Sequence, residues 1–200
     1  PLIPSRWREI NAMTISYGHG LSISPMQLVS GVAAMVNGGV YHAPTFLKKS
    51  VKTNEKGRRV ITKRTSHQVR RLLRLVVTSG TGRKAAAEGY IVGGKTGTAE
   101  RVVGKKYKKK ALISSFIGAF PMNAPQYVVF AMIEEPSGTK KTHGFATGGW
   151  VAAPVIGKVI KRIAPLLSIP AVDEKTAKIE RQLAIDLIPK KKGKSRLASF

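Results

Sequence analysis

The sequence predicts an α+β domain in which a sheet lies between two layers of helices, and three observations lead to this prediction. Segments 111–120 and 127–133 are almost continuously apolar and are separated by a turn that begins at Pro121. Strands that are apolar on both faces need cover on both faces. Segments 28–36 and 152–163, which precede and follow them, carry apolar residues at helical spacing and can supply that cover.

The first core helix is expected to begin at Ser24-Pro25-Met26-Gln27, a capping box with Pro at the first helical position. Its apolar residues follow helical spacing: Leu28, Val29, Val32, Ala33 and Val36. Asn37-Gly38-Gly39 ends the pattern, and two short β-like stretches follow within 40–62. Before this helix, Trp7 and Met13 are expected to pack against the body of the domain.

A second helix is expected between the capping box Thr65-Ser66-His67-Gln68 and Gly80-Thr81-Gly82. Its inward-facing residues repeat at helical spacing: Val69, Leu72, Leu73, Val76 and Val77. Arg70, Arg71 and Arg74 lie between them in the sequence and are interpreted as a solvated face.

The apolar run Tyr90-Ile91-Val92 enters a strand that contains Gly93, Gly94 and Gly97. Glycines within a strand mark a place where another backbone or a ligand comes close. The following segment, 101–110, has six basic residues in ten and is expected to be a flexible hairpin connection. Its charge would steer anionic partners.

An amphipathic helix is expected from Trp150 to about residue 163, where it would lie on the sheet, with Pro154 in its first turn. Residues 1–165 are interpreted as the C-terminal part of a domain. Residues 166–188 would form a C-terminal extension with a helix over 173–187, and the basic segment 189–200 would form a disordered tail.

The charge is the strongest sign of a different function. The chain carries 35 Lys and Arg against 10 Asp and Glu, a net charge of +25, which is typical of proteins that bind nucleic acid or anionic surfaces. Only 6% of residues are aromatic, and no helix-turn-helix, zinc-finger or aromatic-rich RNA motif accompanies the charge. We therefore do not expect a nucleic-acid partner, although a basic binding module remains an alternative. Because there is no cysteine, disulfides and thiolate metal sites are excluded.

Lys95, Thr96 and Thr98 place one cation and two hydroxyls within four residues. Alternate residues of an extended chain share a face, so both hydroxyls should point into one cleft, with strand N–H groups between them. Such a cradle suits a carboxylate or an oxyanion. A bare Lys-Thr-Gly triplet is more often an edge strand with surface side chains, so the neighbouring segments decide between these interpretations.

Four segments together resemble the later part of the transpeptidase domain of penicillin-binding proteins, of the monofunctional cell-division type. One is the Lys95-Thr96-Gly97 triplet. The others are 16–28, 114–121 and 147–155, which are similar to the family's Gly-rich turn and helix, its next strand and the start of its last helix. Order and spacing fit throughout residues 7–165.

This resemblance implies a partial serine β-lactamase/penicillin-binding-protein transpeptidase fold. Its five-stranded antiparallel sheet has helices on both faces, and this chain would supply the last three strands while the N-terminal strands are missing. In the family, the strand equivalent to 127–133 pairs with strands that come earlier. The outer edge of this strand is therefore expected to be open and to promote association of the isolated chain.

The resemblance also implies acyl transfer, in which a serine attacks the penultimate D-Ala carbonyl of a stem peptide and D-Ala leaves; β-lactams acylate the same serine. Lys95 would favour proton transfer towards the leaving group, and the Thr96 and Thr98 hydroxyls would bind the terminal carboxylate. The backbone N–H of Thr98 would be an oxyanion-hole donor, and Gly97 would leave room for the substrate strand. Three further residues would border the cleft: His19, Phe145 and Thr147.

The expected nucleophile is absent from this chain. No Ser-x-x-Lys motif precedes residue 95, and no Ser-x-Asn triplet occurs. Ser137-Gly138-Thr139-Lys140 matches the first motif in letters only, because it contains Gly and follows Glu134-Glu135-Pro136 as a loop would. Although the family is enzymatic, this chain alone is expected to be inactive.

By resemblance, the partners of the intact enzyme are the peptidoglycan stem peptide or its lipid-linked precursor, β-lactams and the cell-wall synthesis machinery. No cofactor and no metal are implied. The expected location is the periplasmic face of the bacterial inner membrane, with the anchor outside this chain, because the sequence has no apolar run of the length that a membrane span needs. The alternatives are a serine β-lactamase relative and the basic binding module.

Overall fold

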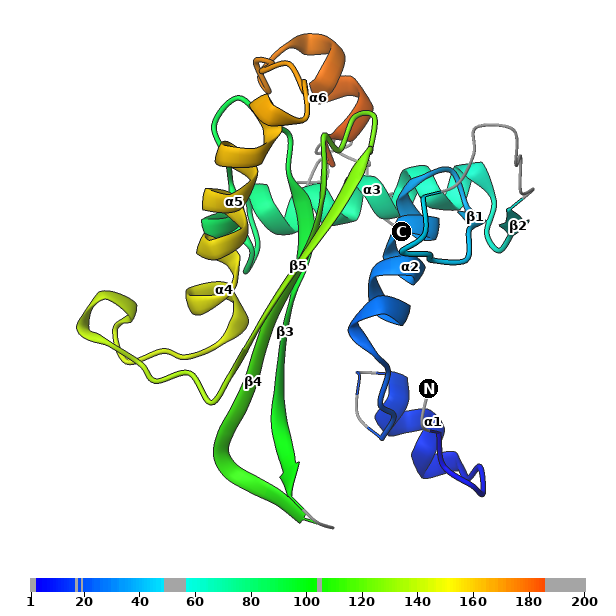
Figure 1. The fold of residues 1–200 in the computed structure, drawn as a ribbon, viewed down its shortest axis with the longest axis vertical. Helices are drawn as coiled ribbons and strands as arrows, with labels where there is room; N and C mark the ends of the chain where they lie inside the picture. The colour runs from blue at the N-terminus through cyan, green and yellow to red at the C-terminus, as the bar shows by residue number, and fades with distance from the viewer. Residues whose placement is uncertain (1–2, 17, 19, 49–56, 104–105, 186–200) are drawn as a thin grey trace, which may run out of the picture.

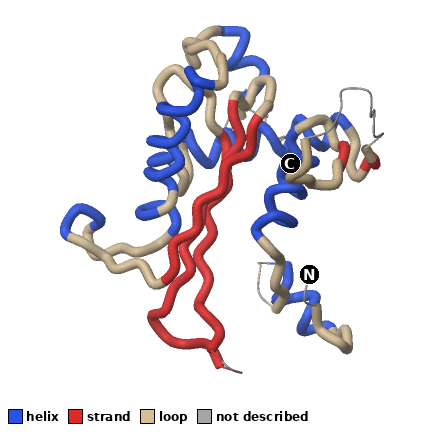
Figure 2. The backbone as a smooth tube through the Cα atoms, viewed as in Figure 1, coloured by secondary structure: helices blue, strands red, loops and turns tan. Residues whose placement is uncertain are grey.

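A computed structural model describes residues 3–16, 18, 20–48, 57–103 and 106–185 of the chain (Figure 1). Within these residues the central layer is a three-stranded antiparallel sheet of order β3-β4-β5. Its strands are β3 (Gly93–Val103), β4 (Lys106–Phe120) and β5 (Tyr127–Glu134). Figure 2 shows the three strands side by side, with helices on either side of them.

The apolar residues of β4 alternate between the two faces of the sheet, as the period of a strand requires. Phe116 and Phe120 are fully buried in a cluster with Ile156 and Ile160 on one face. Ala119 belongs to a second cluster on the other face. The sheet therefore has a hydrophobic core on each side, which confirms the predicted layers.

The first face is covered by α4 (Gly148–Val151), α5 (Ala153–Leu166) and the short 3₁₀ helix η1 (Arg83–Ala85). The single helix expected from Trp150 is interrupted at Ala152, which ends α4 and precedes α5. Pro154 lies in the first turn of α5, where its missing N–H has no helical partner to lose.

The second face is covered by α2 (Pro25–Val36), α3 (Lys63–Thr78) and α6 (Ala177–Leu183). The capping box of α2 is confirmed, since the Gln27 N–H donates to Ser24 Oγ at 3.2 Å and the Ser24 N–H donates to Gln27 Oε1 at 3.0 Å.

The predicted start of α3 was three residues late. Thr62 is the N-cap, and its Oγ1 accepts the N–H of Thr65 at 3.0 Å. The hydroxyls of Thr62 and Thr65 also lie 2.8 Å apart, so the residue expected to cap the helix instead supports the true cap. The helix can therefore begin at Lys63.

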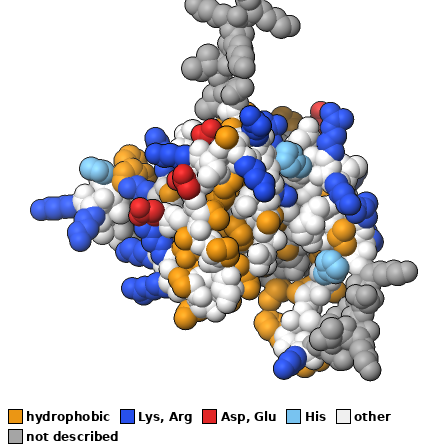
Figure 3. All heavy atoms as spheres, turned by 90° about the horizontal axis from the view of Figure 1, so that it is seen from above, with side chains coloured by type: hydrophobic (Ala, Val, Ile, Leu, Met, Phe, Trp, Pro, Cys, Tyr) orange, Lys and Arg blue, Asp and Glu red, His pale blue; other side chains and the backbone are white. Residues whose placement is uncertain are grey.

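Basic side chains dominate the charged groups on the face seen in Figure 3, in keeping with the net charge of +25. The interpretation of the α3 arginines as a solvated face is nevertheless wrong. Arg70 Nε donates to the Met122 carbonyl at 2.9 Å, and Arg71 Nε donates to the Ala184 carbonyl at 3.1 Å. Desolvation lowers the pKa of Arg70 below its ordinary value. Leu72, expected to point inward, is 55% exposed.

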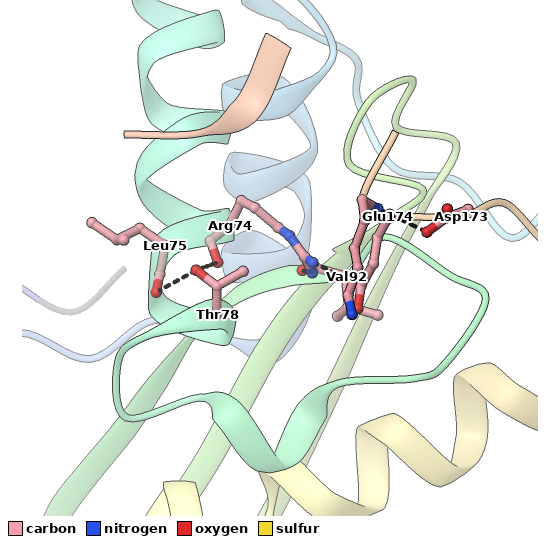
Figure 4. Close-up of polar contacts among 7 residues, drawn as sticks. Arg74, Leu75, Thr78, Val92, Asp173 and Glu174 are labelled. Atoms are coloured by element: carbon pink, nitrogen blue, oxygen red, sulfur yellow. Dashed lines mark hydrogen bonds and ion pairs between the residues drawn. The ribbon is translucent and has the colours of Figure 1, made fainter. Parts of the chain in front are cut away.

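Arg74 joins three parts of the chain (Figure 4). Its Nη1 donates to the Val92 carbonyl at 2.8 Å, just before β3, and its Nη2 forms an ion pair with Glu174 in the segment before α6. The arginines of α3 thus satisfy backbone carbonyls of the sheet turns and the C-terminal segment, which fixes α3 and α6 against the sheet.

The hairpin between β3 and β4 is more regular than expected. Val102 pairs with Tyr107 and Val103 pairs with Lys106, after a register shift near Glu100. The hairpin predicted over 101–110 is therefore present, but its strands extend further than expected, to Val103 and from Lys106, while 104–105 lie outside the described residues. Backbone pairing continues past the core because an antiparallel ladder satisfies its own hydrogen bonds without burial.

The N-terminal part lies apart from the sheet (Figure 1). Helix α1 (Glu9–Ser16) has no buried residue, and Trp7 and Met13 are 58% and 59% exposed. The expected packing of these two residues on the body was wrong for the chain as it stands. After α2, strands β1 (Val40–Tyr41) and β2 (Arg58–Arg59) form a small antiparallel pair. No helix in the described ranges is long and apolar enough to cross a membrane.

Candidate active site

The Lys95–Thr98 stretch lies on β3 at the edge of the described sheet. Thr96 is opposite Phe116 and Thr98 is opposite Ser114, so the two threonines project on the same face of the strand. Thr96 is half-buried, while Lys95 and Thr98 are exposed. The strand therefore presents these polar side chains while its other edge has no strand partner among the described residues.

Both threonines line a cavity of about 320 Å³ between β3, the loop after α3 and the start of α4. The cavity brings together side chains from four segments of the chain. Its lining residues are Gly80, Thr81, Arg83, Lys84, Thr96, Thr98, Thr147, Gly149 and Trp150. It is hydroxyl-rich and has two cations and no acidic residue in its lining, so it suits an anionic ligand of small size.

The Thr96 hydroxyl is held from two sides. Its Oγ1 lies 2.9 Å from Thr81 Oγ1, and Lys95 Nζ donates to it at 3.3 Å and to the Thr96 carbonyl at 2.9 Å. Since an ammonium group can only donate, the Lys95 contact uses a lone pair of Thr96, and the Thr96 proton can go either to Thr81 or to a ligand.

The Thr98 hydroxyl is held by the first turn of α4. The Gly148 N–H donates to Thr98 Oγ1 at 3.1 Å, so the Thr98 proton is also available for a ligand. This close approach requires glycine, because a Cβ at Gly148 would overlap the backbone carbonyl oxygens of Ser115 and Gly97. Gly148 thereby sets the distance between α4 and β3.

Gly97, the glycine of the Lys-Thr-Gly triplet, packs against the Ser115 side chain on β4. A Cβ at Gly97 would lie 2.5 Å from Ser115 Oγ on β4. The sequence-based reason for this glycine was room for a substrate strand. The structure adds an internal reason, which is the packing of Gly97 against the Ser115 side chain.

Trp150, which lines the cavity, belongs to a cluster of aromatic rings. The Phe145 and Trp150 rings are stacked with centroids 5.4 Å apart, and the His143 ring meets Trp150 edge-on at the same distance. Lys84 Nζ lies 4.1 Å from the Trp150 ring centroid, a cation–π contact. The loop that carries His143 and Phe145 is tied to β4 by Ser114 Oγ, which donates to the Ala146 carbonyl at 2.6 Å.

The structure brings most of the predicted site residues together. Thr147 lines the cavity and Phe145 stacks on the lining residue Trp150, whereas His19 lies outside the described residues. Ser137 lies in the loop between β5 and the 3₁₀ helix η2 (Lys140–Thr142), and it is not among the residues that line the cavity. Among the described residues there is no group of three or more His, Asp or Glu that could hold a metal ion.

Besides two glycines, sequence reasoning missed four lining residues that carry side chains. Thr81 was regarded only as part of a helix stop, and Trp150 only as the start of a helix. Arg83 and Lys84 follow a Gly-Thr-Gly turn and had no motif of their own. The available signal was that turn, because glycines on both sides of a polar residue allow a close approach to a strand.

Comparison with known proteins identifies the family. Residues 2–161 match the penicillin binding protein transpeptidase domain. The probable peptidoglycan D,D-transpeptidase FtsI of Caulobacter vibrioides is 39% identical over 178 residues, which cover 84% of this chain and 30% of that protein. Stage V sporulation protein D of Bacillus subtilis is 39% identical over 170 residues, covering 80% of this chain and 26% of that protein.

A solved structure shows the same fold. The apo transpeptidase domain of penicillin-binding protein 3 from Burkholderia pseudomallei superposes with a TM-score of 0.76 at 36% identity, over 86% of this chain and 51% of that chain. The predicted partial fold is thus confirmed, and the chain spans about half of that domain and less than a third of the two curated relatives. By these matches the chain belongs to the penicillin-binding protein transpeptidase domain family.

Proposed function

We propose that this chain is the carboxylate-binding part of a peptidoglycan D,D-transpeptidase. The observation that carries this proposal is the pair of threonine hydroxyls in one cavity. Thr96 and Thr98 both accept hydrogen bonds from within the protein, so their protons can point to a ligand. An acceptor-only group such as the terminal carboxylate of a stem peptide matches two donors of this kind.

Charge supports the same ligand. Arg83 and Lys84 line the cavity, and neither has an ion-pair partner among the described residues. Lys95 adds a third cation on the same strand as the threonines. Since no acidic residue lines the cavity, the three cations would attract a carboxylate, and the hydroxyls would orient it.

The proposed reaction is acyl transfer through an acyl-serine. A serine oxygen bonds to the penultimate D-Ala carbonyl carbon, the peptide bond breaks, and the terminal D-Ala leaves with its amine protonated. An amine of a neighbouring peptide then takes the acyl group and releases the serine. This chain has no Ser-x-x-Lys motif before residue 95, so the serine would come from another part of the complete protein.

Two groups on β3 would act directly in that reaction. Lys95 would stabilise proton transfer towards the leaving amine, and the Thr98 backbone N–H would donate to the developing oxyanion. Chemistry of this type needs donors that are already in place before charge develops. The antiparallel pairing of β3 with β4 supports this preorganisation, because it fixes the backbone of Thr98 opposite Ser114.

We propose the periplasmic face of the bacterial inner membrane as the location, with stem peptides or lipid-linked precursors, β-lactams and the cell-wall synthesis machinery as partners. We also propose the division of the chain into a domain part at 1–165, an extension at 166–188 and a tail at 189–200. Helix α6, which packs on α3, supports the helical extension. The tail lies outside the described residues.

Labelling with a fluorescent penicillin tests the proposal. The complete protein, meaning the whole polypeptide that the gene encodes, should form a stoichiometric adduct. Lys95→Ala should slow its formation by about a hundredfold, since general acid–base catalysis contributes roughly 10²–10⁴ in rate. Lys158→Ala, which removes an exposed charge from α5, is the matched control and should label normally.

Two results would contradict the proposal. One is labelling that is unchanged by Lys95→Ala. The other is a complete protein that takes no label and instead binds DNA or RNA with steep salt dependence, which would favour the basic binding module.

A further inference from the structure

The segment before α6 lies against the segment that leads into β3. The Val172 N–H donates to the Gly89 carbonyl at 2.9 Å. The Val172 side chain also packs on the hydrophobic cluster of the second face, to which Ile91 belongs. Segment 172–174 of the C-terminal extension therefore contacts segment 89–92, which ends where β3 begins.

Arg74 adds a contact at the far end of this lead-in segment. Its side chain is only 12% exposed, its Nη1 donates to the Val92 carbonyl at 2.8 Å, and its Nη2 is paired with the Glu174 carboxylate (Figure 4). A guanidinium is a rigid planar fork of donors, so a carboxylate held on one nitrogen also fixes the direction of the other. Glu174 thereby orients the donor that holds the Val92 carbonyl.

The Val92 carbonyl lies next to the start of the strand that carries the proposed catalytic groups. A Cβ at Gly93 would lie 3.1 Å from the backbone nitrogen of Arg74, so β3 begins directly against α3. Lys95 follows Gly93 by two positions in the continuous pairing of β3 with β4. A shift of the Val92 carbonyl would thus also shift Lys95, and a small misplacement of a catalytic group lowers a rate strongly.

On this basis we propose that Glu174 is a positioning residue, which acts through Arg74 on the start of β3 and so sets the place of Lys95 for acylation. The inference rests on the proposed function, because Lys95 is the group that Glu174 would position. Glu174 lies beyond residues 2–161, the part that matches the transpeptidase domain, so the C-terminal extension would contribute to the site. Glu174 is not among the residues that line the cavity at Thr96, so it should affect the rate of acylation rather than the affinity for penicillin.

Hydrogen exchange of backbone amides tests this link without reference to activity. In the complete protein, Glu174→Ala should raise the exchange rates of amides in 93–98 about three- to tenfold, because Arg74 loses the partner that fixes it. Glu180→Ala is the matched control, since Glu180 is a second exposed carboxylate that lines the same cavity between α3 and α6 as Glu174. This control should leave the exchange in 93–98 unchanged.

The kinetics of penicillin labelling test the effect on the site. Labelling over a range of fluorescent penicillin concentrations separates the dissociation constant of the first complex from the rate constant of acylation. Glu174→Ala should lower the rate constant about five- to tenfold and change the dissociation constant by less than about twofold. Glu174→Asp, which keeps a carboxylate at this position, should return the rate constant to within about threefold of the wild type.

Gln182→Ala distinguishes positioning from a general loss of docking. Gln182 Nε2 donates to the Asn123 carbonyl at 2.8 Å, so it also anchors α6, but at the turn after β4 instead of at the lead-in to β3. This variant should lower the melting temperature and leave the rate constant of acylation within about twofold of the wild type. If Gln182→Ala slows acylation as much as Glu174→Ala does, the extension only adds stability and the positioning role is overturned.

The outcomes separate the two proposals. Unchanged exchange in 93–98, or an unchanged rate constant of acylation, in Glu174→Ala would overturn the role of Glu174 and leave the proposed function intact. A wild-type protein that takes no label would overturn the proposed function, and the exchange measurement would still decide whether Glu174 fixes the start of β3.

Discussion

The two edges of the sheet differ in what lies against them. At the β3 edge, the loop after α3 and the first turn of α4 close around Thr96 and Thr98 and leave one cavity. At the other edge, β5 is a mostly apolar strand whose outer side has no strand partner among the described residues. The β3 edge is thus covered by other segments of the chain. The outer edge of β5 has backbone N–H and C=O groups without a strand partner among the described residues.

This difference indicates where the molecule is incomplete. An exposed apolar edge strand is a template for pairing, and folded proteins normally cover it. Apolar side chains are also exposed in and just before α1, where Trp7 and Ile10 are 58% and 57% exposed. The chain covers 51% of a related transpeptidase domain, and we expect the rest of such a domain to cover these surfaces.

The largest expected effect is a complete loss of activity in the isolated chain. The purified 200-residue polypeptide should show no penicillin adduct by intact-mass measurement, because it has neither Ser-x-x-Lys at a helix start nor Ser-x-Asn. It should also associate through β5, with sedimentation showing oligomers. Supplying the missing half of the domain in trans should reduce this association. A stoichiometric adduct on the isolated chain would contradict the prediction and would bring Ser137 back as a candidate nucleophile.

The next effect concerns the contact that closes the β3 edge. Gly148→Ala should destabilise the complete protein by about 2–3 kcal/mol, because the added Cβ overlaps backbone oxygens that cannot move aside easily. It should also weaken penicillin labelling, since α4 would be displaced from Thr98.

Gly31→Ala is the matched control for this change. A Cβ at Gly31 on α2 has nothing within 4 Å, so the substitution should be neutral or stabilising by up to about 1 kcal/mol. Thermal unfolding compares the two variants. Equal melting temperatures would mean that the α4 contact is not a constraint on the site.

A smaller effect is expected where α3 meets the rest of the fold. Arg70→Ala should lower the free energy of unfolding by about 2 kcal/mol, because the Met122 carbonyl would lose a charged donor. Arg64→Ala on the exposed first turn of the same helix should change it by less than about 0.5 kcal/mol. Urea unfolding measures both, and equal values would restore the interpretation of Arg70 as a solvated residue.

These regions also show what the sequence can predict. The capping box at Ser24 and the shared face of Thr96 and Thr98 depend on neighbours within a few positions, so local patterns were sufficient to predict them. Arg70 contacts the Met122 carbonyl 52 positions away, and Thr81 reaches Thr96 across a turn. Such contacts are set by how distant elements pack, and a helix with alternating arginine and leucine gives no local sign of which side chain is covered.

The smallest expected effect on penicillin labelling comes from the lysines of the hairpin between β3 and β4. Segment 105–110 carries five lysines, and β4, which begins at Lys106, pairs with β3 beyond the core. We expect this charge to steer anionic ligands towards the cavity rather than to bind them. Replacing the five lysines with glutamine in the complete protein should slow penicillin labelling about two- to threefold at low ionic strength. The difference should vanish near physiological salt, where exposed charges are screened over about 8–10 Å. A rate that is unchanged at every salt concentration would leave the lysines as a solvated surface only, and a defect that persists at high salt would indicate direct contact with the ligand.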